Sequence, residues 1–171
     1  LQYLGTQKNA DDPDYVVQDI NGIHVGMVCY TYETGDTSDG RKTLNGNPVP
    51  KQSTDLVTSF NPKQLDEFYD EVVQTLHAMR DAGAEVTMLF IHWGNEYELK
   101  QNKTQSAIAQ QLCELGVDVI VGGHPHVIQP FETLVSSTGH KTYCIYSVGN
   151  ALSNQNRNSL SSTPNSEYTE D

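Results

Sequence analysis

The sequence predicts an α/β domain built around a βαβ unit. Two short and largely apolar runs, residues 86–91 and 117–122, are each bounded by turn-forming residues, a pattern typical of strands that are buried on both faces of a sheet. A helical pattern lies between them, so the segment predicts a strand, a helix and a parallel strand. A histidine follows each run: His92 follows the first, and His124 and His126 follow the second.

These three histidines predict a metal site. Parallel neighbours in an open sheet end at the same edge, where ligands bind, so we expect His92, His124 and His126 to converge. Neutral imidazoles offer nitrogen donors to ions such as Zn, Fe, Ni or Mn. A lone histidine after a strand is more often structural, but the His-x-His spacing in a chain with six histidines makes metal binding an equal alternative to a structural role. Glu96 is either a ligand, an orienting partner, a proton-transfer group or a solvated carboxylate.

Composition limits the class of protein. A chain of 171 residues is long enough for one domain with its own core. Ten Lys and Arg against 22 Asp and Glu give a net charge of −12, which repels a nucleic-acid backbone. Three cysteines in apolar segments predict core thiols rather than a disulfide framework. No apolar run approaches the roughly 20 residues of a membrane span, so we expect any anchor to lie outside these residues.

The first half of the chain predicts a hairpin, a loop and a helix. Residues 15–20 and 23–32 are β-rich and flank Asn21-Gly22, a dipeptide typical of type I′ turns. Residues 33–55 are rich in turn formers and predict a loop, whose basic residues are either solvated or face an anionic substrate. Asn61-Pro62 predicts a helix start, and an apolar stripe at helical spacing continues to a stop at Gly83.

The second half predicts one more helix and two more strands after the histidine run. The helix spans residues 104–115 and ends at Gly116, and the strands span residues 131–135 and 142–148. The last strand runs into a turn over residues 147–150, which is expected to bring either backbone amides or the Asn150 side chain to the site. Residues 151–171 are polar with almost nothing to bury, which predicts a flexible tail after a domain of residues 1–150.

Three motifs in this order resemble the bacterial capsule-synthesis protein CapA family, which includes the PgsA-type proteins of poly-γ-glutamate synthesis and belongs to the calcineurin-like metallophosphoesterase superfamily. The motifs are His92-Trp-Gly-Asn-Glu96, Gly122-Gly-His-Pro-His126 followed by Val127-Ile-Gln-Pro130, and Tyr146-Ser-Val-Gly-Asn150. The resemblance covers nearly all of residues 1–150, since the hairpin and the Asn61-Pro62 helix also fall where the family has them.

The resemblance implies a site and a fold. His92, His124 and His126 would be ligands of divalent Mn, Zn or Fe, two ions in the complete domain. His92, Glu96 and His124 would have catalytic roles, and Asn150 would contact substrate. The implied fold is a four-layer α/β/β/α sandwich of which this chain supplies the C-terminal half. The superfamily's earlier motifs, a bridging Asp and an Asn-His pair, do not occur in this sequence. A two-metal site needs such carboxylates, so the missing N-terminal half of the domain is an expected partner.

Three functional hypotheses remain open. The first is a metal-dependent phosphoesterase of a bacterial cell-surface polymer pathway, anchored through a segment outside this chain. The second is a noncatalytic surface module that binds, assembles or tethers an acidic polymer such as poly-γ-glutamate. The third is a mononuclear zinc hydrolase that uses only His92, His124 and His126. The fragment alone is expected to be inactive under the first hypothesis.

Overall fold

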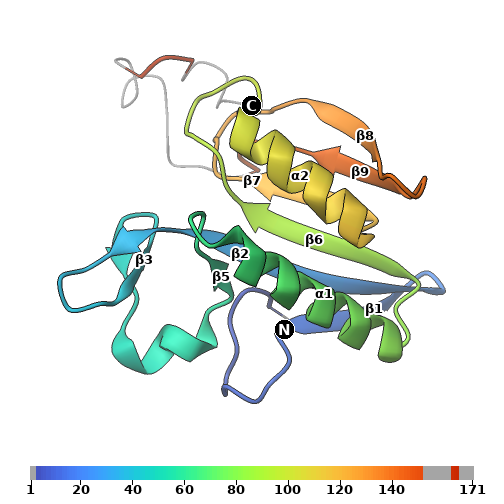
Figure 1. Cartoon of the computed structure of the whole chain (residues 1–171), viewed down its shortest axis with the longest axis horizontal. Helices are drawn as coiled ribbons and strands as arrows, with labels where there is room; N and C mark the ends of the chain where they lie inside the picture. Colours follow the sequence, from blue (N-terminus) through green and yellow to red (C-terminus); the bar gives the residue numbers. More distant parts are fainter. Residues whose placement is uncertain (1–2, 152–162, 166–171) are drawn as a thin grey trace. The chain divides into compact units, whose positions relative to one another are not determined.

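A computed structural model describes residues 3–151 and 163–165 of the chain. The chain divides into two compact units, unit 1 from Leu1 to Ile91 and unit 2 from His92 to Asp171 (Figure 1). The predicted tail, residues 151–171, lies almost entirely outside the described residues. Within the described part, no helix is long and apolar enough to cross a membrane.

Unit 1 begins with the predicted hairpin. Strands β1 (Tyr15–Ile20) and β2 (Ile23–Asp36) pair antiparallel. Asn21 and Gly22 join them with φ angles of 55° and 86°, and a type I′ turn requires positive φ at both positions. The hairpin prediction is confirmed.

The predicted loop over residues 33–55 is partly wrong. β2 continues to Asp36 and pairs with β3 (Lys42–Leu44), which pairs in turn with β4 (Asn47–Pro48). The turn formers Asn45 and Gly46, at φ 48° and 75°, close a tight hairpin rather than a loop. A short 3-10 helix, η1 (Lys51–Leu56), then leads to β5 (Ser59–Phe60), which lies parallel to β2. The last strand of this unit, β6 (Val86–His92), also neighbours β2.

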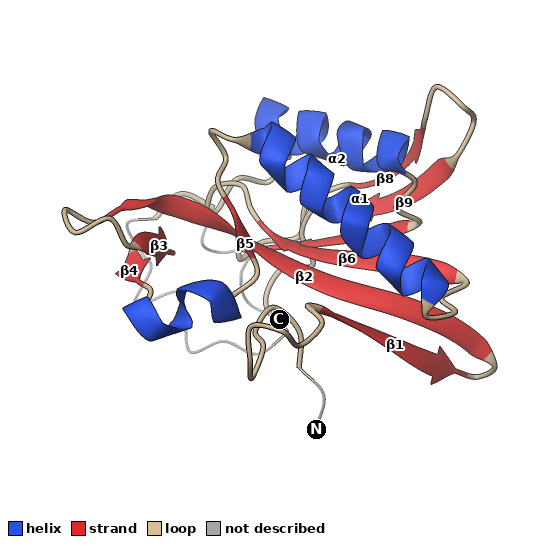
Figure 2. Cartoon of the chain, turned by 60° about the horizontal axis from the view of Figure 1, so that its bottom comes forward, coloured by secondary structure: helices blue, strands red, loops and turns tan. Residues whose placement is uncertain are grey.

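Helix α1 (Leu65–Asp81) packs on the sheet of unit 1 (Figure 2). The predicted start at Asn61-Pro62 is wrong, because the Asn61 side-chain oxygen accepts a hydrogen bond from the Lys63 amide at 2.9 Å and forms a turn ahead of the helix. The predicted apolar stripe is buried against the strands, and the stop at Gly83 is confirmed by its φ of 94°. The buried stripe comprises Phe68, Val72, Leu76 and Met79.

Unit 2 contains helix α2 (Lys103–Leu115) and three neighbouring sheet strands in the order β7 (Val119–Gly123), β9 (Lys141–Ile145) and β8 (Phe131–Val135). β7 and β9 are parallel, and β8 and β9 are antiparallel. α2 begins at a capping box formed by Asn102 and Gln105 and ends at Gly116 in the left-handed conformation. The α/β class is therefore confirmed, with mixed strands and helices as in a metallophosphoesterase-like fold.

The cysteines of the described chain are core thiols. Cys113 and Cys144 are buried, Cys29 is half-buried, and all three are free. The thiols confirm the prediction that no disulfide framework is present.

In unit 2, β8 and β9 are exposed on one face, whereas residues 117–122 alternate between buried and half-buried. The predicted burial of residues 117–122 is therefore complete on one face and partial on the other. α2 packs along β8 and β9 (Figure 1), and Ile120, Leu134 and Cys144 are buried. Residues that pair across neighbouring strands point to the same face of the sheet, so the exposed members of these pairs lie together on the face opposite α2. Phe131 is 61 % exposed and Tyr143 is 51 % exposed, and their rings stack at 6.3 Å.

This second face is mostly apolar, with Thr133 and Lys141 as its polar members. The register aligns Val119 with Tyr143 and Val121 with Ile145, and it aligns Phe131 with Ile145. We call this surface the open face, and it also includes Val135, which is 53 % exposed. A patch of this kind is typical of a surface that another element covers.

Candidate functional site

The three predicted histidines converge within unit 2. His92 is the last residue of β6, and His124 and His126 follow β7. The ring centroids of His92 and His124 are 4.5 Å apart, and those of His124 and His126 are 6.2 Å apart. A backbone hydrogen bond joins the two segments that carry the histidines, since the Trp93 amide donates to the Gly123 carbonyl at 3.2 Å. The convergence expected from the sequence is therefore present.

The backbone is strained where the imidazoles are displayed. His124 has a φ of 97°, His126 a φ of 61° and Tyr97 a φ of 61°. Residues with a Cβ rarely adopt positive φ, and such conformations concentrate at functional sites. Tyr97 is held there by a bond from its amide to the Pro125 carbonyl at 2.8 Å. The unfavourable backbone angles of these loops hold the rings in fixed positions.

His126 has three partners, and two of them were predicted site residues. Its Nδ1 lies 2.8 Å from the Asn150 side-chain oxygen, and its Nε2 lies 4.0 Å from the Glu96 carboxylate. Because the Asn150 oxygen is an acceptor, this bond places the proton on Nδ1 and leaves the lone pair on Nε2. The Tyr97 ring stacks on the imidazole at 5.8 Å. The ring is thus fixed in orientation and tautomer, as second partners do for metal-binding imidazoles.

Burial keeps the first two imidazoles neutral. It lowers the pKa of His92 to about 4, with smaller contributions from the neighbouring His124 and His126, while the Glu96 carboxylate opposes the shift. Burial also lowers the pKa of His124, with help from His126. Both rings are therefore in the form that can donate a lone pair at neutral pH.

A close backbone approach supports these loops from below. Gly122 in β7 lies against the Tyr146 carbonyl, where an added Cβ would come within 2.0 Å of the oxygen and 2.5 Å of Trp93 Nε1. The Trp93 indole donates to the same carbonyl at 2.9 Å. Trp93 is 2 % exposed, so it packs beneath the site and does not reach a ligand. All three sequence motifs meet at this point.

The sequence did not single out Tyr97 or the role of Tyr146. Tyr97 follows Glu96 in an ordinary polar loop. It can stack on His126 only because its backbone is left-handed, and tyrosine has no preference for that conformation. The Tyr146 main chain matters because the segment leaves β9 and pairs with residues after His126, through a bond from the Tyr146 amide to the Pro130 carbonyl at 3.2 Å. Only the adjacent Gly122-Gly123 pair signals this close approach.

The donor set fits a metal in its chemistry but not as a complete site. Three imidazoles, two of them held neutral, are suitable nitrogen ligands. Among the residues that the structure describes, however, no group of three or more His, Cys, Asp or Glu side chains has an arrangement that could hold a metal ion. The three histidines would need further ligands to form the predicted centre.

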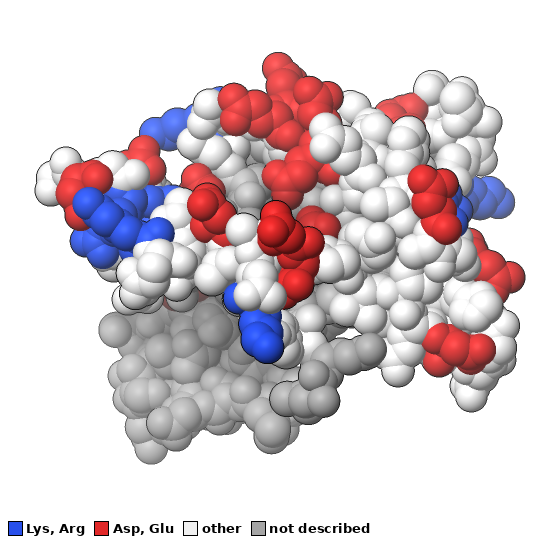
Figure 3. Space-filling model, turned by 90° about the horizontal axis from the view of Figure 1, so that it is seen from below, with Lys and Arg blue, Asp and Glu red and all other residues white. Residues whose placement is uncertain are grey.

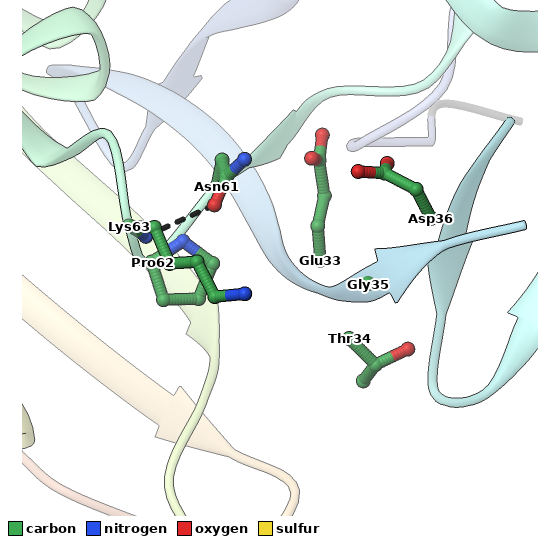
Figure 4. Close-up of a pocket in the computed structure, with 7 residues that line it drawn as sticks. All are labelled: Glu33, Thr34, Gly35, Asp36, Asn61, Pro62 and Lys63. Carbon is green, nitrogen blue, oxygen red and sulfur yellow. Dashed lines mark hydrogen bonds between the residues drawn. The ribbon is translucent and has the colours of Figure 1, made fainter. Parts of the chain in front are cut away.

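A separate polar hollow of about 100 Å³ lies in unit 1 (Figure 4). A β-bulge between Glu33 and Gly35 shifts the register so that Glu33 pairs with Leu44 and Asp36 with Lys42, which places both carboxylates on one side of β2. Lys63 reaches the same hollow from the turn before α1. No histidine lines this hollow, so it is distinct from the histidine site.

Two of the three basic residues of the predicted loop, Lys42 and Arg41, are engaged in contacts within unit 1. Lys42 donates to the Ser59 hydroxyl at 2.8 Å and to the Val57 carbonyl at 3.1 Å, and it lies 4.0 Å from Glu33. Arg41 pairs with Asp39 at 2.9 Å. Both side chains stabilise their own loop, so the described contacts give no support to a role in binding an anionic substrate.

The class of protein defined by these features is an α/β protein with a histidine-lined site on loops that follow β6 and β7. Residues 1–155 match the family described as Bacterial capsule synthesis protein PGA_cap. The chain belongs to this family of capsule biosynthesis proteins.

Two curated relatives are similar to the chain. One is "Capsule biosynthesis protein CapA" of Bacillus anthracis, 28 % identical over 160 residues, which is 91 % of this chain and 33 % of the relative. The other is "PGA biosynthesis protein CapA" of Bacillus subtilis (strain 168), 36 % identical over 72 residues, which is 42 % of this chain and 18 % of the relative. The chain thus spans about a third of the length of the first relative.

The close approach at Gly122 makes a matched pair of substitutions informative. Gly122→Ala is expected to lower the free energy of unfolding by about 3 kcal/mol, because the new methyl group meets a backbone carbonyl that cannot move freely. Gly123→Ala should stay within about 1 kcal/mol of wild type, since an added Cβ there meets nothing within 4 Å. Denaturant unfolding of both variants measures the difference, and equal stabilities would contradict the packing described here.

The lowered pKa of His92 predicts a pH dependence of stability in metal-free protein. The unfolded chain takes up a proton near the ordinary value of 6.5, whereas folded His92 takes it up only near pH 4. Stability is therefore lost as the pH falls through this window. His92→Gln should lose less unfolding free energy than wild type between neutral pH and pH 4.5, and His77→Gln, on the exposed side of α1, should behave like wild type. Identical pH profiles for wild type and His92→Gln would refute the assignment.

Proposed function

We propose that this chain forms the C-terminal part of a metal-dependent phosphoesterase domain that acts in capsule biosynthesis at the bacterial cell surface. The observation that carries the proposal is the meeting of His92, His124 and His126 on strained loops in a member of the capsule synthesis family. Strain, neutral imidazoles and a fixed tautomer together support ligand binding better than a structural role.

The residues of this chain would divide the work of such a site. His92, His124 and His126 would hold a divalent ion, which supplies Lewis-acid chemistry for phosphoester hydrolysis. His92 and His124 present neutral imidazoles, and Asn150 keeps the lone pair of His126 on Nε2. Glu96 is exposed and lies 4.0 Å from His126, where it can orient that ring, add a ligand to the ion or act as a proton-transfer group. Asn150 lies beside the same ring, where it can also contact a substrate.

The remaining ligands would come from the part of the protein outside this chain. The described histidines do not form a complete metal centre, and the chain spans about a third of the Bacillus anthracis relative. The open face adds a second reason, since an apolar sheet surface with a stacked Phe131–Tyr143 pair is typical of a surface that another element covers. We infer that another layer of the same domain covers it.

Surface charge supports the catalytic hypothesis over the binding of an acidic polymer. Acidic side chains are spread across the face shown in Figure 3, with basic side chains in a few separate places. The net charge of −12 repels a polyanion. A polymer tether would need a cationic surface supplied by other parts of the protein.

The catalytic proposal is tested with the whole protein and a panel of phosphomonoesters and phosphodiesters in the presence of Mn or Zn. His124→Ala should lower the rate by at least 100-fold, since a ligand to the catalytic ion is lost. The control His77→Ala changes an exposed histidine in unit 1 and should keep wild-type activity. Equal activity in wild type and His124→Ala would end the catalytic proposal, and polymer binding that survives loss of the histidines would favour the noncatalytic module. One tightly held zinc in this fragment alone would favour the mononuclear hydrolase.

The inferred covering layer predicts protection of the open face in the whole protein. Tyr143 is 51 % exposed in this chain, whereas Tyr146, three residues away, is 1 % exposed. In hydroxyl-radical footprinting of the native whole protein, Tyr143 should be modified as slowly as Tyr146, and both should react freely after unfolding. Rapid modification of native Tyr143 would show that the open face faces solvent.

A further inference from the structure

Two buried glutamines connect the loops that carry the histidines. Gln105, in the first turn of α2, is 1 % exposed, and Gln129, three residues after His126, is 3 % exposed. The Gln105 side-chain amide donates to the Gln129 side-chain oxygen at 3.0 Å. Side-chain amides are rarely buried so completely, and they stay buried only when their hydrogen bonds are made.

Both the side-chain amide and the backbone amide of Gln129 make hydrogen bonds. Its side-chain nitrogen donates to the Glu98 carbonyl at 2.7 Å and to the Lys100 carbonyl at 3.3 Å. Its backbone amide donates to the Ser147 carbonyl at 3.1 Å. One residue therefore ties the loop after His126 to the loop after His92 and to the segment that leads to Asn150.

Gln105 anchors the same network to α2. Its side-chain oxygen accepts a hydrogen bond from the backbone amide of Asn102 at 3.0 Å, and its backbone amide donates to the Asn102 side-chain oxygen at 2.9 Å. The side chain also fills the space above Gly94, where an added Cβ would lie 2.7 Å from the Gln105 amide carbon. Gly94 is two residues after His92, so the position of this loop is fixed by contact with Gln105.

We propose that Gln105 and Gln129 form an amide brace that sets the separation of the two histidine loops, which makes both glutamines positioning residues of the site. The brace acts through the loops, since these hydrogen bonds join the two glutamines to each other, to Asn102 and to backbone carbonyls of the loop after His92. It rests on the proposed function only for its effect on metal binding. Its effect on the loops stands without a metal.

The chain offers a matched control on the same helix. Gln110 also donates from its side chain to a backbone carbonyl, that of Val135 at 3.1 Å, and it bonds to Glu114 at 3.2 Å. These bonds lead away from the histidines. Gln110→Leu therefore removes a comparable amide without touching the brace.

The test compares wild type, Gln129→Leu and Gln110→Leu in the whole protein by hydrogen exchange with mass spectrometry and by titration with Zn²⁺. Gln129→Leu should exchange faster in residues 94–101 and 124–130 than elsewhere, because the bonds between these segments are lost. Its Zn²⁺ affinity should fall by about tenfold to 100-fold, as for other groups that orient metal ligands. Gln110→Leu should match wild type in both measurements.

Gln105→Glu provides a second variant should Gln129→Leu not fold. It keeps the oxygen that accepts from Asn102 and removes the donor to Gln129, so it should show the same local exchange and loss of affinity. Wild-type exchange in both loops, or a uniform rise across the protein, would overturn the brace. Local exchange with unchanged Zn²⁺ affinity would overturn its positioning role. Absence of Zn²⁺ binding by wild type would count against the proposed function, while the exchange data would still decide whether the brace exists.

Discussion

The site depends on one backbone contact, the approach of Gly122 to the Tyr146 carbonyl. Trp93 donates to that carbonyl from its indole nitrogen, and its own amide bonds to Gly123. The three sequence motifs meet at this point. The space at position 122 is so small that only glycine fits. His92 and His124 lie within two residues of this contact, so it fixes where the two histidine loops begin, and the strained backbone at His124 and His126 sets how those two imidazoles are displayed.

Much of this arrangement follows from local sequence. The Asn21-Gly22 turn, the apolar stripe of α1 and the apolar runs before the histidines have period and composition that permit only one secondary structure each. The three histidines were placed together because strands of one sheet share an edge. Asn150 was placed near them because its turn follows the next strand, and its bond to His126 bears this out.

Other features depend on contacts between distant residues and could not be predicted. The β3–β4 hairpin within residues 33–55 uses the same turn formers that a loop would use. The helix start moved from Asn61 to Leu65 because Asn61 caps a turn instead of the helix. The left-handed Tyr97 and the buried Gln105–Gln129 pair have no local signature, since their role arises only when two loops meet. Apolar residues on both sides of β7 predicted burial on both faces, and one face is only half-buried, because complete cover requires a second layer.

The open face and the incomplete donor set indicate the same property of this chain. A sheet whose second face carries Phe131, Val135 and Tyr143 has the composition of an interior surface. A histidine cluster with a single carboxylate beside it, that of Glu96, has the composition of part of a metal centre. Both are accounted for if the remainder of a longer capsule synthesis protein contributes a covering layer and the missing ligands, which agrees with the one-third coverage of the Bacillus anthracis relative.

The central claim is that the three imidazoles are ligands to a divalent ion in the whole protein. Anomalous diffraction from crystals of the whole protein grown with Mn²⁺ or Zn²⁺ tests it most directly. The account predicts an anomalous peak at coordination distance, about 2.0 to 2.2 Å, from nitrogens of His92, His124 and His126, with carboxylate ligands from outside this chain. A peak that lies elsewhere, or an ordered water in its place at saturating metal, would contradict it.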